Sequence, residues 1–170
     1  MNQRFGSVVV GLASVALAAC ASNAAMQAAR EAHYQGDRNA MLDTVLQTVQ
    51  SRYQIGDVNP ETGLIVTRDR WYEKDGTFED HKLSSEQGYV VEDRSILLSY
   101  QVQLRTDGPE YRVEVTPIIA QHRVGYAAPY KMKPDDLEVP GWIHGKTEKL
   151  TLAIYDALAP YRSNDPTVQR

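Results

Sequence analysis

The residue with the most specific chemistry in this 170-residue chain is its one cysteine, Cys20. A thiol can be alkylated, can bind a metal or can form a disulfide, and the sequence holds no second cysteine for a disulfide. Every residue from Val8 to Ala19 is apolar or small, and Arg4 is the only charged side chain before Cys20. Such a run is too short for a permanent transmembrane helix, which needs about 20 apolar residues. It is typical of a secretion signal that ends immediately before the cysteine.

The four residues Leu17-Ala18-Ala19-Cys20 resemble the lipobox of bacterial lipoproteins. In that family the cysteine sulfur carries a diacylglyceryl group, the chain is cut just before the cysteine, and the new amine is usually acylated. The resemblance implies that residues 1–19 are a cleaved signal peptide and that Cys20 is the lipidated N-terminus. Several acyl chains on one residue exceed the marginal membrane binding that a single chain gives.

The residue after the cysteine bears on localisation. Ala21 stands there, whereas an aspartate at this position tends to keep enteric lipoproteins in the inner membrane. The alanine therefore resembles an outer-membrane address. We expect a lipid-anchored protein on the periplasmic face of the outer membrane, with the inner membrane and the cell surface as alternatives.

The other residues with catalytic or metal-binding side chains show no recognisable spacing. No histidine lies four residues from another, as in a helical metal pair. The histidines are His33, His81, His122 and His144. Asp80 and His81, next to Glu79, form one local acid–base group, and Ser84 and Ser85 lie in a loop with no obvious base. The chain has no nucleophile elbow, phosphate loop or dinucleotide fingerprint. We expect no metal, no cofactor and no enzymatic activity, and a periplasmic hydrolase at Asp80 and His81 is the least favoured alternative.

Large aromatic side chains are the next candidates, because tryptophan and tyrosine are enriched at protein interfaces. Three of them lie in or beside the proline-containing segment from Gly125 to Gly141, and a fourth lies in a β-rich segment. The candidates for contact with a partner are Trp71, Tyr126, Tyr130 and Trp142. The alternative is that these rings pack beneath a long loop as a small satellite core.

Composition limits the class of protein. The chain has 18 basic and 22 acidic residues, and removal of residues 1–19 takes away one arginine, so the mature protein is acidic. This charge argues against nucleic-acid binding, which needs a basic face, and against a polybasic lipid-binding surface. The length suffices for one domain with a hydrophobic core. We expect a lipidated N-terminus and tether over residues 20–36, one domain over residues 37–161 and a loose tail over residues 162–170.

Hydrophobic periodicity predicts two amphipathic helices with strands between them. Asp37 is the expected N-cap of the first helix, and the second ends before Pro160. Two long strands with alternating side chains flank the turn Thr106–Pro109 and should form an antiparallel hairpin. The expected elements are a helix over residues 41–53, strands over 64–72, 77–78, 96–105 and 111–119, and a helix over 143–158. Residues 57–63 are expected to form a turn and residues 125–141 a long loop.

This order of elements predicts an α+β fold. A three- or four-stranded antiparallel sheet would be covered on one face by the two helices, as a two-layer sandwich. Arg68, Asp69 and Arg70 interrupt an otherwise apolar strand, so we expect them at an edge of the sheet, where charges discourage unwanted pairing.

The order of helix, strands and helix after a lipidated cysteine resembles the small domains of the C subunit of the outer-membrane β-barrel assembly machinery. The segment Thr62-Gly63-Leu64-Ile65-Val66-Thr67, which leaves the first helix for an edge strand, is similar in character. The resemblance spans residues 37–158 and implies a helix-grip fold and a scaffold-like role. That subunit differs in carrying two such domains and a long disordered N-terminal segment, and no functional residue is carried over.

These patterns predict an accessory or scaffold lipoprotein of the bacterial envelope that binds another envelope component, most simply a protein, without catalysis. The lipid would hold the domain near its partner and so raise the effective concentration of each for the other. The alternative function is a carrier or sensor of a small apolar ligand bound between the sheet and the helices.

Overall fold

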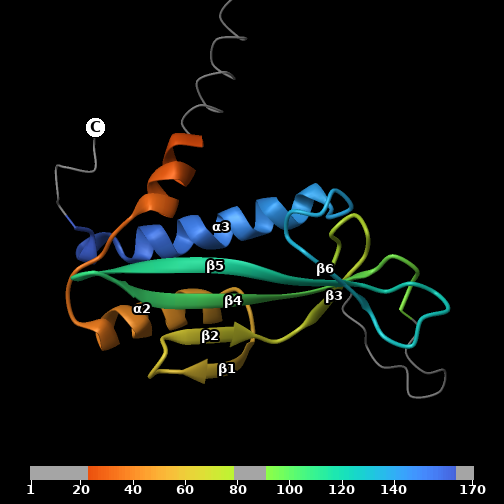
Figure 1. The fold of residues 1–170 in the computed structure, drawn as a ribbon, viewed down its shortest axis with the longest axis horizontal. Coiled ribbons are helices and arrows are strands. Elements are labelled where there is room, and N and C mark those ends of the chain that lie inside the picture. Colours follow the sequence, from red (N-terminus) through yellow and green to blue (C-terminus); the bar gives the residue numbers. More distant parts are fainter. Residues whose placement is uncertain (1–22, 79–90, 164–170) are drawn as a thin grey trace, which may run out of the picture.

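The computed structural model describes residues 23–78 and 91–163. They form an α+β fold in which an open antiparallel sheet of six strands has helices packed against it (Figure 1). In chain order the elements are α2 Arg38–Gln50, β1 Ile55–Asn59, β2 Leu64–Thr67, β3 Arg70–Tyr72, β4 Ile96–Asp107, β5 Glu110–Gln121, β6 Tyr130–Met132, α3 Gly141–Ala157 and the 3-10 helix η1 Ala159–Tyr161. A further helical segment covers residues 23–31. In the described ranges, no helix has the length and apolar character needed to cross a membrane.

The β4–β5 hairpin is the centre of the sheet. The strands lie in the order β1-β2-β4-β5-β6, and β3 pairs with β4 beyond the end of β2. All twelve residues of β4 pair with β5, from Ile96 opposite Gln121 to Asp107 opposite Glu110. The α+β class and the long hairpin predicted from the alternation of side chains are therefore confirmed.

The expected sheet of three or four strands is wrong, because β1 and β6 lie in segments predicted as a turn and a loop. Their sequences, Ile-Gly-Asp-Val-Asn and Tyr-Lys-Met, lack the alternation of a half-buried strand. They pair with β2 and β5, and this tertiary context overrides their weak intrinsic preference. The single strand expected over residues 64–72 is present as two strands, β2 and β3. Arg68 and Asp69 lie between them and are exposed.

The core is a cluster of buried side chains from α2, α3 and the sheet. On β4 the buried residues of this cluster alternate along the strand, and they are Ile96, Leu98, Tyr100, Val102 and Leu104. They pack with the buried side chains of both helices, which are Met41, Leu42, Val45, Val49, Ile143, Leu150 and Ile154. Figure 1 shows α3 running along β5, and α2 also contacts α3. Both predicted helices are present, and each buries one apolar side.

Specific contacts fix the residue before α2 and the residue before β2. Asp37 caps α2 as predicted, because its carboxylate accepts a hydrogen bond of 2.8 Å from the N–H of Ala40. Gly63, which precedes β2, has a φ of 72°, and a Cβ there would collide with the carbonyl oxygen of Leu104. Only glycine meets both conditions, so this residue sets the approach of β2 to β4.

The segment before α2 packs against the folded body. Tyr34 is only 2% exposed and belongs to the core cluster. The backbones of Tyr34 and Tyr111 exchange two hydrogen bonds of 2.9 Å, and Tyr34 also forms a β-bridge with Arg162. Tyr34 belongs to the segment expected as a tether, and Arg162 is the first residue of the expected tail. The folded unit therefore extends into both segments.

Candidate functional site

Trp142, one of the aromatic residues singled out in the sequence, has a structural contact. It lies on α3 and packs on Tyr72 of β3, with ring centroids 5.3 Å apart. Its indole N–H donates a hydrogen bond of 3.0 Å to the carbonyl oxygen of Lys74. Gly76 leaves room for the ring, since a Cβ at that position would collide with it. Trp142 therefore holds the turn after β3 against α3.

The other three aromatic candidates are dispersed. Trp71 stands edge-on to His122, with ring centroids 6.3 Å apart. Tyr130 is half-exposed, and the guanidinium carbon of Arg123 lies 4.1 Å from its ring centroid. Tyr126 is 68% exposed. No ring contact in the described part of the chain joins these three residues to one another.

One edge of β5 is hydrogen-bonded at both ends and open between them. At one end Tyr111 pairs with Tyr34, and at the other end Ile119 pairs with β6. Backbone groups alternate in direction along a strand, so the N–H groups of Val113 and Val115 point to the same edge as that of Tyr111. Within residues 23–78 and 91–163, neither of these two amides has a backbone partner.

The open edge spans the residues between 111 and 119, or about 27 Å at the usual rise of a strand. Its outward groups are the N–H and C=O of Val113 and Val115 and the C=O of Pro117. Proline has no N–H, and in sheets it is found on edge strands at positions whose N–H would face outward. Pro117 is therefore a sequence signal for this edge.

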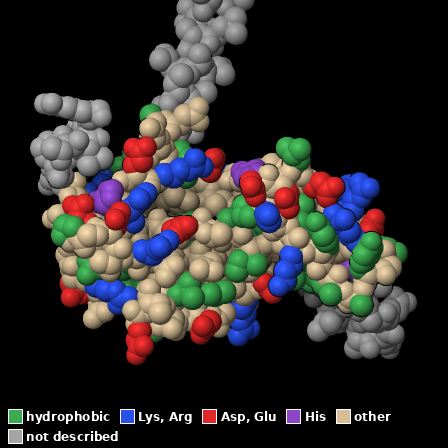
Figure 2. Space-filling model, in the orientation of Figure 1, with side chains coloured by type: hydrophobic (Ala, Val, Ile, Leu, Met, Phe, Trp, Pro, Cys, Tyr) green, Lys and Arg blue, Asp and Glu red, His purple; other side chains and the backbone are tan. Residues whose placement is uncertain are grey.

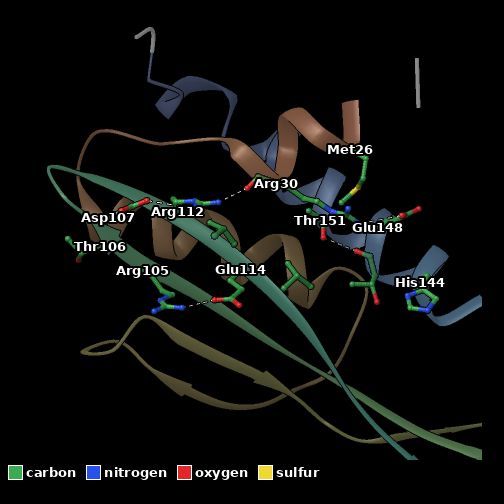
Figure 3. A pocket seen from close by; sticks show the side chains of 13 residues that line it. Met26, Arg30, Arg105, Thr106, Asp107, Arg112, Glu114, His144, Glu148 and Thr151 are labelled. Carbon is green, nitrogen blue, oxygen red and sulfur yellow. Dashed lines mark hydrogen bonds and ion pairs between the residues drawn. The ribbon is translucent and has the colours of Figure 1, made fainter. Parts of the chain in front are cut away.

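A groove of about 560 Å³ follows the open edge (Figure 3). It is lined by consecutive residues of β5, from Arg112 to Val115, whose side chains point to both faces of the sheet, and by Arg105 to Asp107 at the paired end of β4. The groove therefore extends along β5 and around the end of the β4–β5 hairpin. The opposite wall comes from α3 and the helical residues 23–31. A hydrogen bond of 2.9 Å from Arg112 to the carbonyl oxygen of Arg30 joins the two walls. We call this the edge groove.

The arginines of the edge groove are paired with carboxylates. The pairs are Arg30–Glu148 at 3.6 Å, Arg105–Glu114 at 2.8 Å and Arg112–Asp107 at 3.6 Å. All six side chains are partly exposed, so each pair contributes little to stability. The edge groove is therefore polar but close to neutral.

A second groove, of about 630 Å³, lies between α3, β3 and the residues after α2. Its aromatic side chains are Tyr53, Tyr72 and Phe78. Its charged side chains are Arg52, Arg70, Lys146, Lys149 and Asp156. Because four of the five charges are positive, we call it the cationic groove. Charged side chains of both signs are interspersed elsewhere on the protein, as Figure 2 shows for one face.

Two of these cations lie over the aromatic rings. The guanidinium carbon of Arg70 is 5.5 Å from the ring centroids of both Tyr53 and Phe78. The ammonium nitrogen of Lys146 is 4.9 Å from the ring centroid of Tyr72. Tyr72 and Phe78 contact each other with centroids 5.7 Å apart. The aromatic residues therefore position both cations, each by about 0.5–1 kcal/mol at such exposed sites.

The tyrosines of the cationic groove have raised pKa values. Burial raises the pKa of Tyr53 and of Tyr72, although the charge of Arg70 acts in the opposite direction on both. Burial raises the pKa of Tyr100, whose ring contacts that of Tyr53, more strongly. All three phenols keep their protons at neutral pH, so they do not serve as bases.

The remaining candidates from the sequence are placed as follows. Cys20 and the acid–base group at Asp80 and His81 lie outside the described residues. Where the structure does describe the chain, no group of three or more His, Cys, Asp or Glu side chains is arranged to hold a metal ion. His33 lies 3.2 Å from the carboxylate of Asp107, and His144 lines the edge groove.

Both grooves were missed in the sequence. The cationic groove had one local signal, because Lys146 and Lys149 are spaced to share a helix face. Arg52 and Arg70 join them only through the fold. No protein-family model matches this chain, and no curated protein matches its sequence.

Proposed function

We propose that this protein is a lipid-anchored, non-catalytic accessory protein of the bacterial envelope that binds a protein partner along the open edge of β5. The lipobox-like sequence Leu17-Ala18-Ala19-Cys20 supports the anchor, with the domain on the periplasmic side of the outer membrane. The unpaired backbone of β5 supports the binding function.

The observation that carries this proposal is the pair of free amides on β5. An extended peptide can add to such an edge as a further strand, with main-chain hydrogen bonds for affinity and side-chain pockets for specificity. The N–H groups of Val113 and Val115 would donate to carbonyl groups of the added strand. The space between Tyr34 and β6 fits a strand of about five to seven residues.

The opposite edge of the sheet is less suited to this role. It is formed by β1, which has five residues and a register irregularity between Ile55 and Asp57. Short edge strands, irregularities and charged residues are the features by which proteins prevent pairing at an edge. The open stretch of β5 is longer and regular, although it carries Pro117 and the charged side chains of Arg112 and Glu114.

The side chains of the edge groove favour an amphipathic partner segment. Val113 and Val115 are half-buried and lie on the face of β5 that packs toward the helices. Arg112 and Glu114 are exposed on the other face. Because neighbouring strands place paired side chains on the same face, an added strand would alternate apolar and charged residues.

The proposed anchor is close to the edge groove. Asn23 begins the helical segment that forms part of its wall, and it is three positions after Cys20. Three residues reach at most about 10 Å when fully extended. A lipid on Cys20 would therefore hold the groove near the membrane, where a membrane-bound partner has a high effective concentration.

A helix-grip arrangement, with both long helices on one face of the sheet as a two-layer sandwich, is the fold we propose at finer detail. It is supported by the single core cluster that α2 and α3 share with the alternate residues of β4. The scaffold-like role of the resembling C-subunit domains agrees with a binding function.

Site-specific photo-crosslinking in cells tests this proposal. A photoreactive residue at Arg112 should give an adduct of discrete mass, whereas one at Asn59 on β1 should not. Val115→Pro removes an outward N–H and should abolish the adduct, whereas Val115→Thr keeps the N–H and should retain it. Circular dichroism of both variants serves as the folding control. Equal adducts at both positions, or an adduct insensitive to Val115→Pro, would exclude the β5 edge as the binding site.

The carrier of a small apolar ligand is not favoured by a specific observation. Both grooves have charged walls. Core side chains from β4 and the two long helices pack together between the sheet and the helices.

A further inference from the structure

The cationic groove differs in charge from the protein as a whole. The chain has 18 basic and 22 acidic residues, yet this groove combines four basic side chains with the single carboxylate of Asp156. Asp156 itself lies 3.9 Å from Arg162, which is not part of the groove. Within the described residues, a net acidic protein therefore has an excess of positive charge in this groove.

Among the described residues, no carboxylate forms an ion pair with the four cations of this groove. These cations are Arg52, Arg70, Lys146 and Lys149. The arginines of the edge groove, in contrast, are each paired with a carboxylate. Like charges lining one groove repel one another, and low-dielectric walls strengthen the positive potential between them. An anion that enters the groove relieves this repulsion.

We propose that the cationic groove binds a phosphate ester, with its phosphate groups on the four cations and its organic part on the aromatic side chains. No residue that lines this groove also lines the edge groove, and the proposal does not depend on the anchor at Cys20. Arginine offers a planar pair of N–H donors that matches two phosphate oxygens, and lysine adds a compact charge. The groove supplies both kinds of donor.

The aromatic residues explain why the cations are held ready for a ligand. Arg70 lies over Tyr53 and Phe78, and Lys146 lies over Tyr72, so both side chains are positioned before the ligand arrives. A cation held over a ring loses less freedom on binding, because part of its ordering has already taken place. The guanidinium of Arg70 already donates a hydrogen bond of 3.4 Å to the carbonyl oxygen of Arg52 and interacts with the phenol of Tyr72, so its remaining N–H groups are the donors left for a ligand.

The apolar part of the groove indicates an organic ligand. Phe78 is 48% exposed, although a ring of this size is usually buried. Leu152 and Ala153 of α3 continue the apolar wall. The pairing of an exposed ring with four cations suits a phosphate group attached to an organic body. A soluble phosphate ester and the headgroup of an anionic phospholipid share this chemistry.

A double substitution of exposed cations tests the site. Arg52→Gln/Lys149→Gln removes two charges from the groove, and Lys131→Gln/Lys133→Gln removes two charges from exposed positions in and after β6. All proteins are the full chain with Cys20→Ser, so that no acyl group carries them to lipid. Calorimetric titration with pyrophosphate measures binding of a soluble phosphate group. Co-sedimentation with vesicles of phosphatidylglycerol, against vesicles of phosphatidylcholine, measures binding of a lipid headgroup.

The expected result is saturable binding of pyrophosphate, of phosphatidylglycerol vesicles or of both. The Arg52→Gln/Lys149→Gln variant should bind at least about tenfold more weakly, because two charge-assisted contacts are lost, and the Lys131→Gln/Lys133→Gln control should bind as the parent does. Pyrophosphate binding alone identifies a soluble ester, and vesicle binding alone identifies a headgroup. The proposal is overturned if the parent binds neither probe, or if both double variants are weakened equally. Neither result affects the crosslinking test of the β5 edge.

Discussion

The replacement of Tyr34 by alanine should destabilise the protein severely, although Tyr34 lies in a segment that the sequence presents as a tether. The side chain is only 2% exposed. An aromatic side chain buries about 150–250 Å², which corresponds to about 4–6 kcal/mol at about 25 cal/mol per Å². Residual compactness of the unfolded chain reduces this figure by roughly 10–40%. The free energy of unfolding should therefore fall by about 3–5 kcal/mol, which agrees with large-to-small substitutions of buried aromatic residues.

Urea unfolding of the full chain with Cys20→Ser measures this loss. The midpoint should fall while the dependence on urea concentration stays unchanged, because the amount of surface exposed on unfolding is nearly the same. Two controls bracket the result. Tyr34→Phe keeps the ring and should stay within about 1 kcal/mol of the parent, and Tyr126→Ala removes the same atoms from a ring that is 68% exposed and should change stability by less than about 0.5 kcal/mol.

A loss below about 1 kcal/mol for Tyr34→Ala would refute the packing of this segment. It would show that the two backbone hydrogen bonds between Tyr34 and Tyr111 do not hold the residue in the core in solution. The wall of the edge groove formed by residues 23–31 would then be held only by the contacts of Arg30 with Arg112 and Glu148, and the proposed position of the anchor would have to be abandoned.

Three further predictions concern the anchor, the glycine before β2 and the stability at alkaline pH. Cys20→Ser should release the protein from membranes or leave an unprocessed precursor, and a processed, membrane-bound variant in fractionation would contradict lipidation. Gly63→Ala should lower the free energy of unfolding by about 1–3 kcal/mol. Gly108 is also at positive φ, but no atom lies within 4 Å of a Cβ added there, so Gly108→Ala should lower the free energy of unfolding by less. Equal losses for the two variants would argue against the collision with Leu104. Burial raises the pKa of Tyr34 from 10.0 to about 12, so the unfolded chain loses this proton at a lower pH than the folded protein does. The contribution of Tyr34 to the free energy of unfolding is therefore fully present below pH 10 and falls as the pH rises toward 12. Tyr34→Phe should remove that part of the alkaline loss, and parallel pH profiles for parent and variant in urea titrations would count against it.

The parts of the fold that could be predicted are those where local pattern and tertiary environment agree. The alternation of apolar and polar residues along β4 predicts a strand with one buried face. Asp37, which precedes apolar residues at helical spacing, predicts the start of a helix. β1 and β6 were not predictable in this way, because their pairing depends on β2 and β5 and not on their own side chains. Tyr34 was missed for the same reason, since its neighbours His33 and Gln35 are polar and its partner Tyr111 is far away in the sequence.

The candidate sites were less predictable than the fold. Trp142 was predicted to contact a partner, because tryptophan is enriched at protein interfaces, but in the structure its ring holds a turn against α3. The features that make the grooves are relations between elements. The open edge exists because Tyr34 and β6 cover only the ends of β5, and the cationic groove exists because Arg52 and Arg70 meet a lysine-bearing face of α3. Neither relation leaves a periodic signal in the chain.

α3 connects the two grooves and keeps their chemistry apart. Glu148 and Thr151 line the edge groove, whereas Lys146 and Lys149 line the cationic groove. Successive residues of a helix point about 100° apart, so these two pairs lie on different faces of the same helix. Glu148 neutralises Arg30 on one face, while the lysines on the other face form no ion pair with any carboxylate of the described residues. The helix therefore presents a neutral wall to a proposed protein strand and a positive wall to a proposed phosphate ester, and both can be occupied at once without sharing a side chain.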